Sequence, residues 1–225
     1  MKKYVSGKSI LLTFLFFIFY FTDTLIQAQN DTVYFIFPQF VQGSVKMKTG
    51  RIEVAFMNYN KATEEMIFEK DGVLMALDSL QTIDTVYIES RVFIPHNKVF
   101  YELLVKGKVS LFVQNKSNLV DAGSYSGYGG KTETGAVRNL TSISNSVQTY
   151  KFKLPTDSYV TDATLFWITK DDKFYKSNTA SQIMKVFPEK SKEIKQFIKD
   201  HKLDLKNTND LITLIVKCNE FVRSR

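Results

Sequence analysis

The residues that could support acid–base or metal chemistry are few and widely spaced. The chain has only two histidines and one cysteine. His96 lies in a Pro-His-Asn stretch and His201 follows a lysine-rich stretch, so neither has a second ligand at the spacing of common metal sites. Cys218 has no second cysteine to pair with and no base beside it, so we expect an inert buried thiol. We therefore predict no metal and no cofactor.

Carboxylates offer the remaining route to catalysis. Glu64-Glu65 and Asp171-Asp172 are adjacent pairs in polar stretches, where neighbours of this kind are usually solvated rather than matched as acid and base. An exported hydrolase acting on glycans or peptides would have to use carboxylates such as Glu89, Glu102 or Asp121. We keep that hydrolase as the alternative to a non-catalytic protein, for which we predict no catalytic residues.

Two glycine-rich stretches resemble catalytic motifs without completing them. Gly130-Lys131-Thr132 matches the end of a phosphate-binding loop, but Tyr125 occupies the position of its first glycine. Gly123-Ser124-Tyr125-Ser126-Gly127 has the outline of a serine nucleophile elbow, but its central residue is tyrosine. Neither stretch predicts an activity.

The elements that would position these residues follow a two-residue rhythm through the middle of the chain. Apolar and polar residues alternate there, with many β-branched and aromatic side chains, which is typical of antiparallel strands. Asp71-Gly72 and Thr49-Gly50 fall between such runs and predict hairpin turns. The predicted strands cover residues 33–37, 44–48, 51–59, 66–69, 73–77, 85–88, 91–94, 99–105, 109–113, 147–154, 163–170 and 173–176.

Several of these strands are apolar in a way that requires cover. Ile52, Val54 and Phe56 share one face of their strand, which we expect to be the buried face of the sheet. Phe100 and Tyr101 lie on opposite faces of one strand, so that strand needs cover on both sides. We expect later segments of the chain to provide it, or else a curled sheet that encloses a small ligand. We expect Trp167 to pack rather than to act as a ligand platform.

Residues 118–146 lose the alternation. The stretch is crowded with Gly, Ser, Thr, Asn and Tyr and has no visible period. A loop of this length inside a compact domain is either functional or disordered. We predict a flexible insertion, with an adaptable contact surface as the alternative.

The rhythm becomes helical from Ser181 onward. Ser181 is the expected N-cap, Pro188 suits the first turn of a second helix, and the Asn207–Asp210 stretch (residues 207–210) predicts the cap of a third. The apolar stripes of the three helices are Ile183, Val186 and Phe187; Ile194, Phe197 and Ile198; and Leu211, Leu214, Ile215, Cys218 and Val222. The many lysines are interleaved with acids and lack an aromatic platform, so we predict a solvated face and no nucleic-acid partner. The alternative for this face is a loose attraction to anionic surfaces.

The beginning of the chain predicts export. Lys2, Lys3 and Lys8 precede an apolar run at residues 10–21, and small and polar residues follow up to Ala28. This order fits a cleaved signal peptide, and the run is short for a bilayer span. An uncleaved anchor is the alternative. The whole chain carries a formal charge of +7. The leader holds three Lys against one Asp, and residues 181–225 hold ten Lys or Arg against six Asp or Glu, so the predicted β region between them is nearly neutral.

Several stretches resemble a family of exported β-rich proteins that is widespread in Bacteroidota and has no assigned activity. They are the Gly43–Gly50 stretch (residues 43–50), Asn58-Tyr59-Asn60, Glu65-Met66-Ile67-Phe68 and the helical end that begins Phe187-Pro188-Glu189-Lys190. The resemblance covers most of the chain after the leader except residues 118–146. It implies a cellular setting and not a mechanism.

Together these observations predict an α+β protein that is mainly β, an antiparallel meander forming a curled sheet, a barrel-like sheet or a sandwich, with a short C-terminal helical segment. The expected parts are a signal peptide at 1–28, a β domain at 29–180 and helices at 181–225 that pack on it. We predict a non-catalytic binding or scaffold module of the periplasm or cell envelope. Its partner would be another envelope protein or a small apolar ligand, with no stable membrane span once the leader is cleaved.

Overall fold

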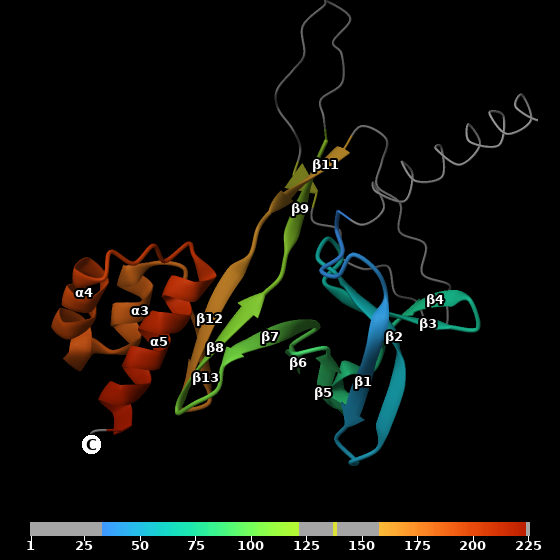
Figure 1. Cartoon of the computed structure of the whole chain (residues 1–225), viewed down its shortest axis with the longest axis horizontal. Helices are drawn as coiled ribbons and strands as arrows, with labels where there is room; N and C mark the ends of the chain where they lie inside the picture. Colours follow the sequence, from blue (N-terminus) through green and yellow to red (C-terminus); the bar gives the residue numbers. More distant parts are fainter. Residues whose placement is uncertain (1–32, 122–136, 139–157, 224–225) are drawn as a thin grey trace, which may run out of the picture.

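A ten-stranded antiparallel sheet forms most of the protein. The computed structural model describes residues 33–121, 137–138 and 158–223, and every structural statement below concerns those residues. The strands of the large sheet lie in the order β13-β12-β8-β7-β6-β5-β1-β2-β3-β4, and the sheet does not close, since β13 and β4 are its two edges (Figure 1). Their bounds are β1 Val41–Met47, β2 Ile52–Asn60, β3 Glu65–Lys70, β4 Val73–Ala76, β5 Ile83–Ile88, β6 Arg91–His96, β7 Val99–Val105, β8 Val109–Gln114, β12 Leu165–Lys170 and β13 Lys173–Lys176. The mainly-β prediction with C-terminal helices is confirmed.

Short turns join most neighbouring strands. Lys70 pairs with Val73 across Asp71 and Gly72, whose φ angles of 53° and 74° are both positive. Two central residues with positive φ match the right-handed twist of a hairpin, and aspartate and glycine tolerate that conformation. The predicted turn at Thr49-Gly50 is present as well, because β1 and β2 pair from Lys46–Ile52 to Val41–Met57.

A small three-stranded sheet rises from the end of β8. It contains β9 (Ser117–Asp121), β10 (Val137–Arg138) and β11 (Ser158–Asp162), in the order β10-β9-β11. Part of the predicted loop at 118–146 is therefore strand: the sequence lacks alternation there, but pairing with β11 fixes the backbone. The rest of that loop, the two glycine-rich stretches, the predicted strand 147–154 and the leader lie outside the described residues.

The curled half of the large sheet encloses a core of its own side chains. Val45, Met57, Tyr59, Phe93 and Phe100 are among the buried residues that fill this half, and each is at most 5% exposed. Tyr59 and Phe93 stack with ring centroids 5.8 Å apart. Large aromatic and apolar side chains thus occupy the inside of the curl, the alternative site that the sequence predicts for a small ligand.

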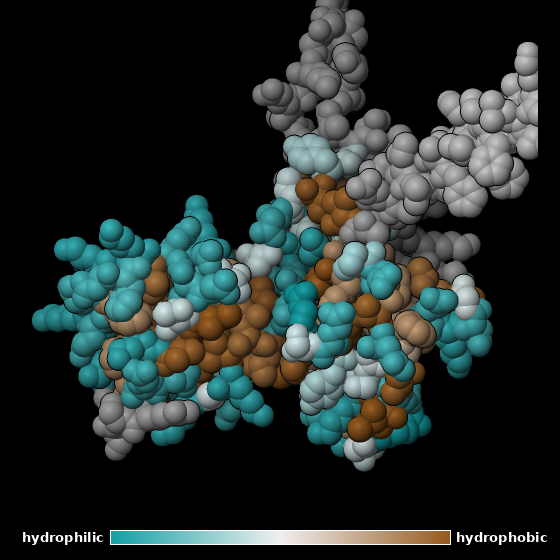
Figure 2. Space-filling view, viewed as in Figure 1, coloured by the Kyte–Doolittle hydropathy of each residue, from teal (hydrophilic) through white to brown (hydrophobic). Residues whose placement is uncertain are grey.

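Three helices cover the other half of the sheet. They are α3 (Ala180–Val186), α4 (Ser191–Asp200) and α5 (Thr208–Arg223), with 3-10 turns at Leu80–Thr82 and Pro188–Lys190. Ile183, Ile194, Leu211, Leu214 and Cys218 pack with β8 and β12 in a second core. The predicted stripes therefore face the sheet, and the outer faces of the helices are hydrophilic (Figure 2). No helix within the described ranges is long and apolar enough to span a membrane.

Capping explains where the helices begin. Thr179, not the predicted Ser181, is the N-cap of α3: its hydroxyl accepts from the amide of Gln182 (3.3 Å), and the Gln182 side chain accepts from the Thr179 amide (3.1 Å). This reciprocal capping box satisfies two amides at once, which Ser181 cannot do. At α5 the predicted cap is confirmed, because Asn207 Oδ1 accepts from the amides of Asn209 and Asp210.

Two predictions about the β region are wrong. Residues 33–37 make only an isolated bridge, Phe35 to Asn60, because β1 takes that side of β2 from Val41 onward. Ile52, Val54 and Phe56 do share a face of β2, but they are 63%, 60% and 56% exposed. The curl turns the opposite face of β2 inward, and the helices that might cover the outer face lie over β8 and β12 instead.

Candidate functional site

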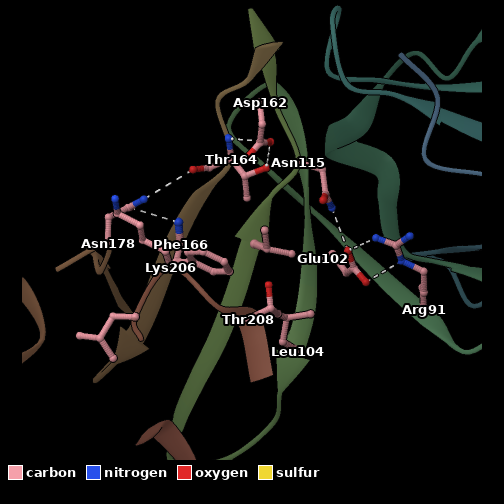
Figure 3. A pocket seen from close by; sticks show the side chains of 12 residues that line it. Arg91, Glu102, Leu104, Asn115, Asp162, Thr164, Phe166, Asn178, Lys206 and Thr208 are labelled. Carbon is pink, nitrogen blue, oxygen red and sulfur yellow. Dashed lines mark hydrogen bonds and ion pairs between the residues drawn. The ribbon is translucent and has the colours of Figure 1, made fainter. Parts of the chain in front are cut away.

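A polar cleft lies where the curled half of the sheet meets the helix-covered half. We call it the cleft. Its volume is about 460 Å³, and it opens to solvent between strands β6, β7, β8 and β12 and the segment that leads into α5. Its lining residues are Arg91, Glu102, Leu104, Val113, Asn115, Asp162, Thr164, Phe166, Asn178, Leu205, Lys206 and Thr208 (Figure 3).

An ion pair forms one wall of the cleft. Arg91 on β6 donates from Nε to Glu102 Oε1 (2.6 Å) and from Nη2 to Glu102 Oε2 (2.5 Å). Phe93 pairs with Glu102 across β6 and β7, so Arg91 is the diagonal neighbour of Glu102 on the same face of the sheet. The two-pronged geometry matches the planar guanidinium to the planar carboxylate.

Neighbouring side chains fix this pair further. Asn115 donates from Nδ2 to Glu102 Oε2 (2.8 Å), so three donors converge on the two carboxylate oxygens. The Arg91 guanidinium carbon lies 5.3 Å from the ring centroid of Phe37 and 5.6 Å from that of Phe93. The Glu102 side chain is 8% exposed and that of Arg91 is 30% exposed, so only the arginine offers a substantial surface to a ligand.

The facing wall carries hydroxyl and amide groups. Thr164 donates from its hydroxyl to Asp162 Oδ1 (2.6 Å), and Asn178 bridges backbone groups by accepting from the Phe166 amide (3.2 Å) and donating to the Thr164 carbonyl (3.5 Å). Lys206 reaches the cleft from the chain before α5. Figure 3 shows these groups on the side away from the ion pair. The cleft therefore offers hydrogen-bond donors and acceptors together with charged groups of both signs.

The cleft can hold a polar ligand, but its buried carboxylate is poorly placed for hydrolysis. Glu102 accepts three hydrogen bonds from Arg91 and Asn115, so its carboxylate is engaged in a structural ion pair. Asp162, the second carboxylate in the lining, is bound to its own neighbour Thr164. Of the other predicted hydrolase residues, Glu89 is exposed in the β5–β6 turn with φ 52°, away from the lining, and the side chain of Asp121 is outside the described residues.

The two histidines and the cysteine lie apart from one another. His96 stacks on Phe174 with ring centroids 3.8 Å apart, and burial lowers its pKa. His201 is exposed beside Phe197 at the end of α4. Cys218 belongs to α5 and is buried in the core between the helices and the sheet, where burial raises the pKa of its thiol to about 12. Among the described residues, no three His, Cys, Asp or Glu side chains are grouped as a metal site would require.

Trp167 belongs to an aromatic cluster on the sheet face opposite the helices. It stacks on Tyr101 at 5.8 Å and donates from Nε1 to Gln114 Oε1 (3.1 Å). Tyr101 also contacts Phe174, and Phe174 contacts Phe112. This arrangement supports the prediction that Trp167 packs.

The two pairs of adjacent acids predicted to be solvated differ in their exposure and contacts. Asp171 and Asp172 are exposed in a hairpin turn, as predicted. Glu64 is not a solvated turn residue: its side chain is 13% exposed, pairs with Lys116 at 3.0 Å and accepts from Gln114 Nε2 at 2.5 Å. The β2–β3 turn and β8 lie side by side only after the sheet curls, so the sequence gives no local signal for this contact.

No protein-family model matches the chain, and neither a curated protein nor a solved structure is similar to it at a significant level. The resemblance to exported proteins of Bacteroidota therefore stays a prediction.

Proposed function

We propose that the protein is a non-catalytic binding or scaffold protein of the cell envelope, exported with its leader removed near Ala28. The basic, apolar and small-residue order of the leader supports export. The resemblance to exported proteins of Bacteroidota agrees with that setting. In this proposal the cleft binds a polar group of another envelope component.

The observation that carries the proposal is the fixed Arg91–Glu102–Asn115 network. Its polar atoms satisfy one another, so they hold the wall rigid without a ligand, and the part of Arg91 still exposed can donate to one. A rigid site of mixed donors and acceptors binds without paying for reorganisation. A hydrolase of this compartment would instead need a carboxylate free to exchange a proton.

The filled core favours recognition at the surface over transport of a small apolar ligand. Tyr59, Phe93 and Phe100 occupy the interior of the curl and are each at most 1% exposed. An apolar ligand would have to displace these rings. A polar partner needs no such displacement, because the cleft is already open.

Photochemical crosslinking in cells tests the proposal. A photoreactive lysine derivative is placed at Lys206, which lines the cleft, or at Lys195, which is exposed on α4 outside it. We expect a discrete adduct from position 206 that disappears when Thr164→Trp fills the cleft. Equal labelling from both positions, or an adduct that survives Thr164→Trp, would overturn the cleft as the binding site.

Catalysis is tested separately on the purified protein. Fluorogenic peptide and glycan substrates are offered to the unaltered chain and to Glu102→Gln. We expect no turnover in either. Turnover that Glu102→Gln removes while the circular dichroism spectrum is unchanged would establish the hydrolase instead.

A further inference from the structure

Strand β2 has a strand on both sides over only part of its length. Its ladder with β1 runs from Ile52 to Met57, but its ladder with β3 begins only at Phe56, which pairs with Glu69. The β3–β4 hairpin then turns aside from the lower end of β2 (Figure 1). Between Ile52 and Ala55, no described strand lies on the β3 side.

The backbone groups on this open side can be identified. The amide of Met47 donates to the carbonyl of Arg51 (2.8 Å), which makes Arg51 face β1. Because hydrogen-bonding direction alternates along an antiparallel strand, Ile52 and Val54 direct their amides and carbonyls to the open side. An edge of this kind is a template for another strand.

The side chains along this edge are apolar on the outer face of the sheet and include the charged pair Arg51 and Glu53 on the other. Ile52, Val54 and Phe56 form an exposed stripe on the outer face, and Figure 2 shows apolar surface over the lower part of β1 and β2. A groove of about 780 Å³ adjoins the same edge, and Met57, Phe68 and Met75 line it together with Glu53 and Val54. An added strand would therefore find an apolar stripe on one face and charged partners on the other.

We propose that the strand that covers this edge is β2 of a second copy of the chain, paired antiparallel with Ile52 on the two-fold axis. The charges beside the edge select this arrangement. With Ile52 opposite itself, Arg51 of each copy lies opposite Glu53 of the other, so two attractive pairs form. Arg51 and Glu53 already contact each other within the chain and are 70% and 55% exposed, so both are free to turn.

The neighbouring registers are less favourable. Pairing Ile52 with Val54 of the other copy sets Glu53 against Glu53, which places like charges opposite each other. Centring the pair on Val54 requires the open side of Phe56, which β3 already occupies. The Ile52-centred register is the one that uses free backbone groups and opposite charges together. It is independent of what the cleft binds.

A cysteine at the axis tests the register in the full chain. In a hydrogen-bonded antiparallel pair the two Cα atoms are about 5.5 Å apart, within disulfide range. Cys218 is buried and does not compete. We expect Ile52→Cys to give a covalent dimer under mild oxidation. The control Val54→Cys, similar in exposure and on the same face, should give much less, because Val54 of the second copy then lies opposite Gly50, four positions from Val54 along the strand. Equal or greater crosslinking of Val54→Cys would overturn the register.

Charge exchange tests the association without a new thiol. Sedimentation equilibrium of the full chain should show a dimer that Arg51→Glu or Glu53→Arg weakens at least about tenfold, since like charges then face each other. The double exchange Arg51→Glu with Glu53→Arg should restore it, because each copy then carries both changes. A monomer at every concentration, or a double exchange no better than the singles, would overturn the proposal.

Discussion

At the scale of single residues, the Arg91–Glu102 pair shows how the protein fixes a polar wall inside an otherwise apolar sheet. Removing one partner of a nearly buried pair leaves the other charge without compensation. Glu102 is the more buried of the two, and Asn115 depends on it as well. The stability of the cleft therefore depends more on Glu102 than on any other charged residue in its lining.

We predict that Glu102→Gln lowers the free energy of unfolding by about 2–4 kcal/mol, because the partly buried Arg91 then loses its charged partner. Urea denaturation measures the change. The matched control is Glu53→Gln, which breaks the exposed contact with Arg51 and should cost less than about 1 kcal/mol. Equal losses in the two variants would contradict the role given to the buried pair.

His96 gives the protein an acid-sensitive position. Burial against Phe174 and Tyr101 disfavours the imidazolium and lowers its pKa. Below its ordinary pKa the unfolded chain binds the proton more readily than the folded protein does. The folding stability that depends on a neutral His96 is therefore fully present above about pH 6.5. It is lost as the pH falls through the folded-state pKa of His96.

We predict that the free energy of unfolding falls between neutral pH and about pH 5, and that His96→Phe falls less steeply over the same range. Phenylalanine keeps the aromatic contacts but cannot be protonated. Urea denaturation at a series of pH values measures both slopes. Identical slopes in the two proteins would show that His96 does not contribute.

At the scale of elements, one side chain joins the last helix to the β7–β8 turn. Asn219 on α5 accepts from the Val109 amide (3.0 Å) and donates to the Val109 carbonyl (2.7 Å) and to the Ile215 carbonyl (3.1 Å). A Cβ atom on Gly107 would lie 2.5 Å from Asn219 Oδ1. The turn therefore needs glycine at the point where the helix docks.

We predict that Asn219→Ala costs about 2–4 kcal/mol, because it leaves buried backbone groups of β8 without partners. Thermal or urea unfolding measures the loss. Asn207→Ala, which removes the exposed cap of α5, should cost only about 1 kcal/mol. A larger loss for Asn207→Ala than for Asn219→Ala would contradict this assignment.

The strands and helices were largely predictable, because hairpin turns and apolar helical stripes follow from local sequence patterns. The strands from Val41 to Val113 and the stripe of α5 appear where the alternation and the helical spacing place them. The exposed face of β2 was not predictable in the same way. Alternation shows that Ile52, Val54 and Phe56 share a face, but not which face the curl turns inward.

At the scale of the whole molecule, two separate cores share one sheet. Leu214 belongs to the core under the helices and Met66 to the core inside the curl, and both are fully buried. β7 and β8 are adjacent strands of the sheet that connects the two regions. A protein built in this way can open one region while the other stays folded.

We predict that Leu214→Ala, a loss of about 2–5 kcal/mol, speeds amide hydrogen exchange in α3–α5, β8 and β12 but leaves β2 and β5 protected. Met66→Ala should give the reverse pattern. Native-state exchange read by mass spectrometry distinguishes them. A uniform increase over the described chain in both variants would mean that the two cores unfold as one unit.

The cleft could not be predicted from the sequence, because its walls come from segments far apart in the chain. Arg91 and Glu102 lie on neighbouring strands, so opposite charges in a predicted hairpin gave a weak signal for their contact. Asp162, Asn178 and Lys206 join them only through the pairing of β8 with β12 and the docking of α5. Such long-range contacts leave no local periodicity.

The pairing of β9 with β11 has a consequence for how this architecture can vary. Asp121 lies opposite Ser158 at the outer end of this pair, so the chain leaves the body and returns to it at nearly the same point. An insertion directly after Asp121 or before Ser158 adds no residue to the ten-stranded sheet or to either core, and only the small sheet, in which β10 pairs with β9, adjoins it. A reporter domain inserted at this point should therefore leave the fold of the remaining protein unchanged.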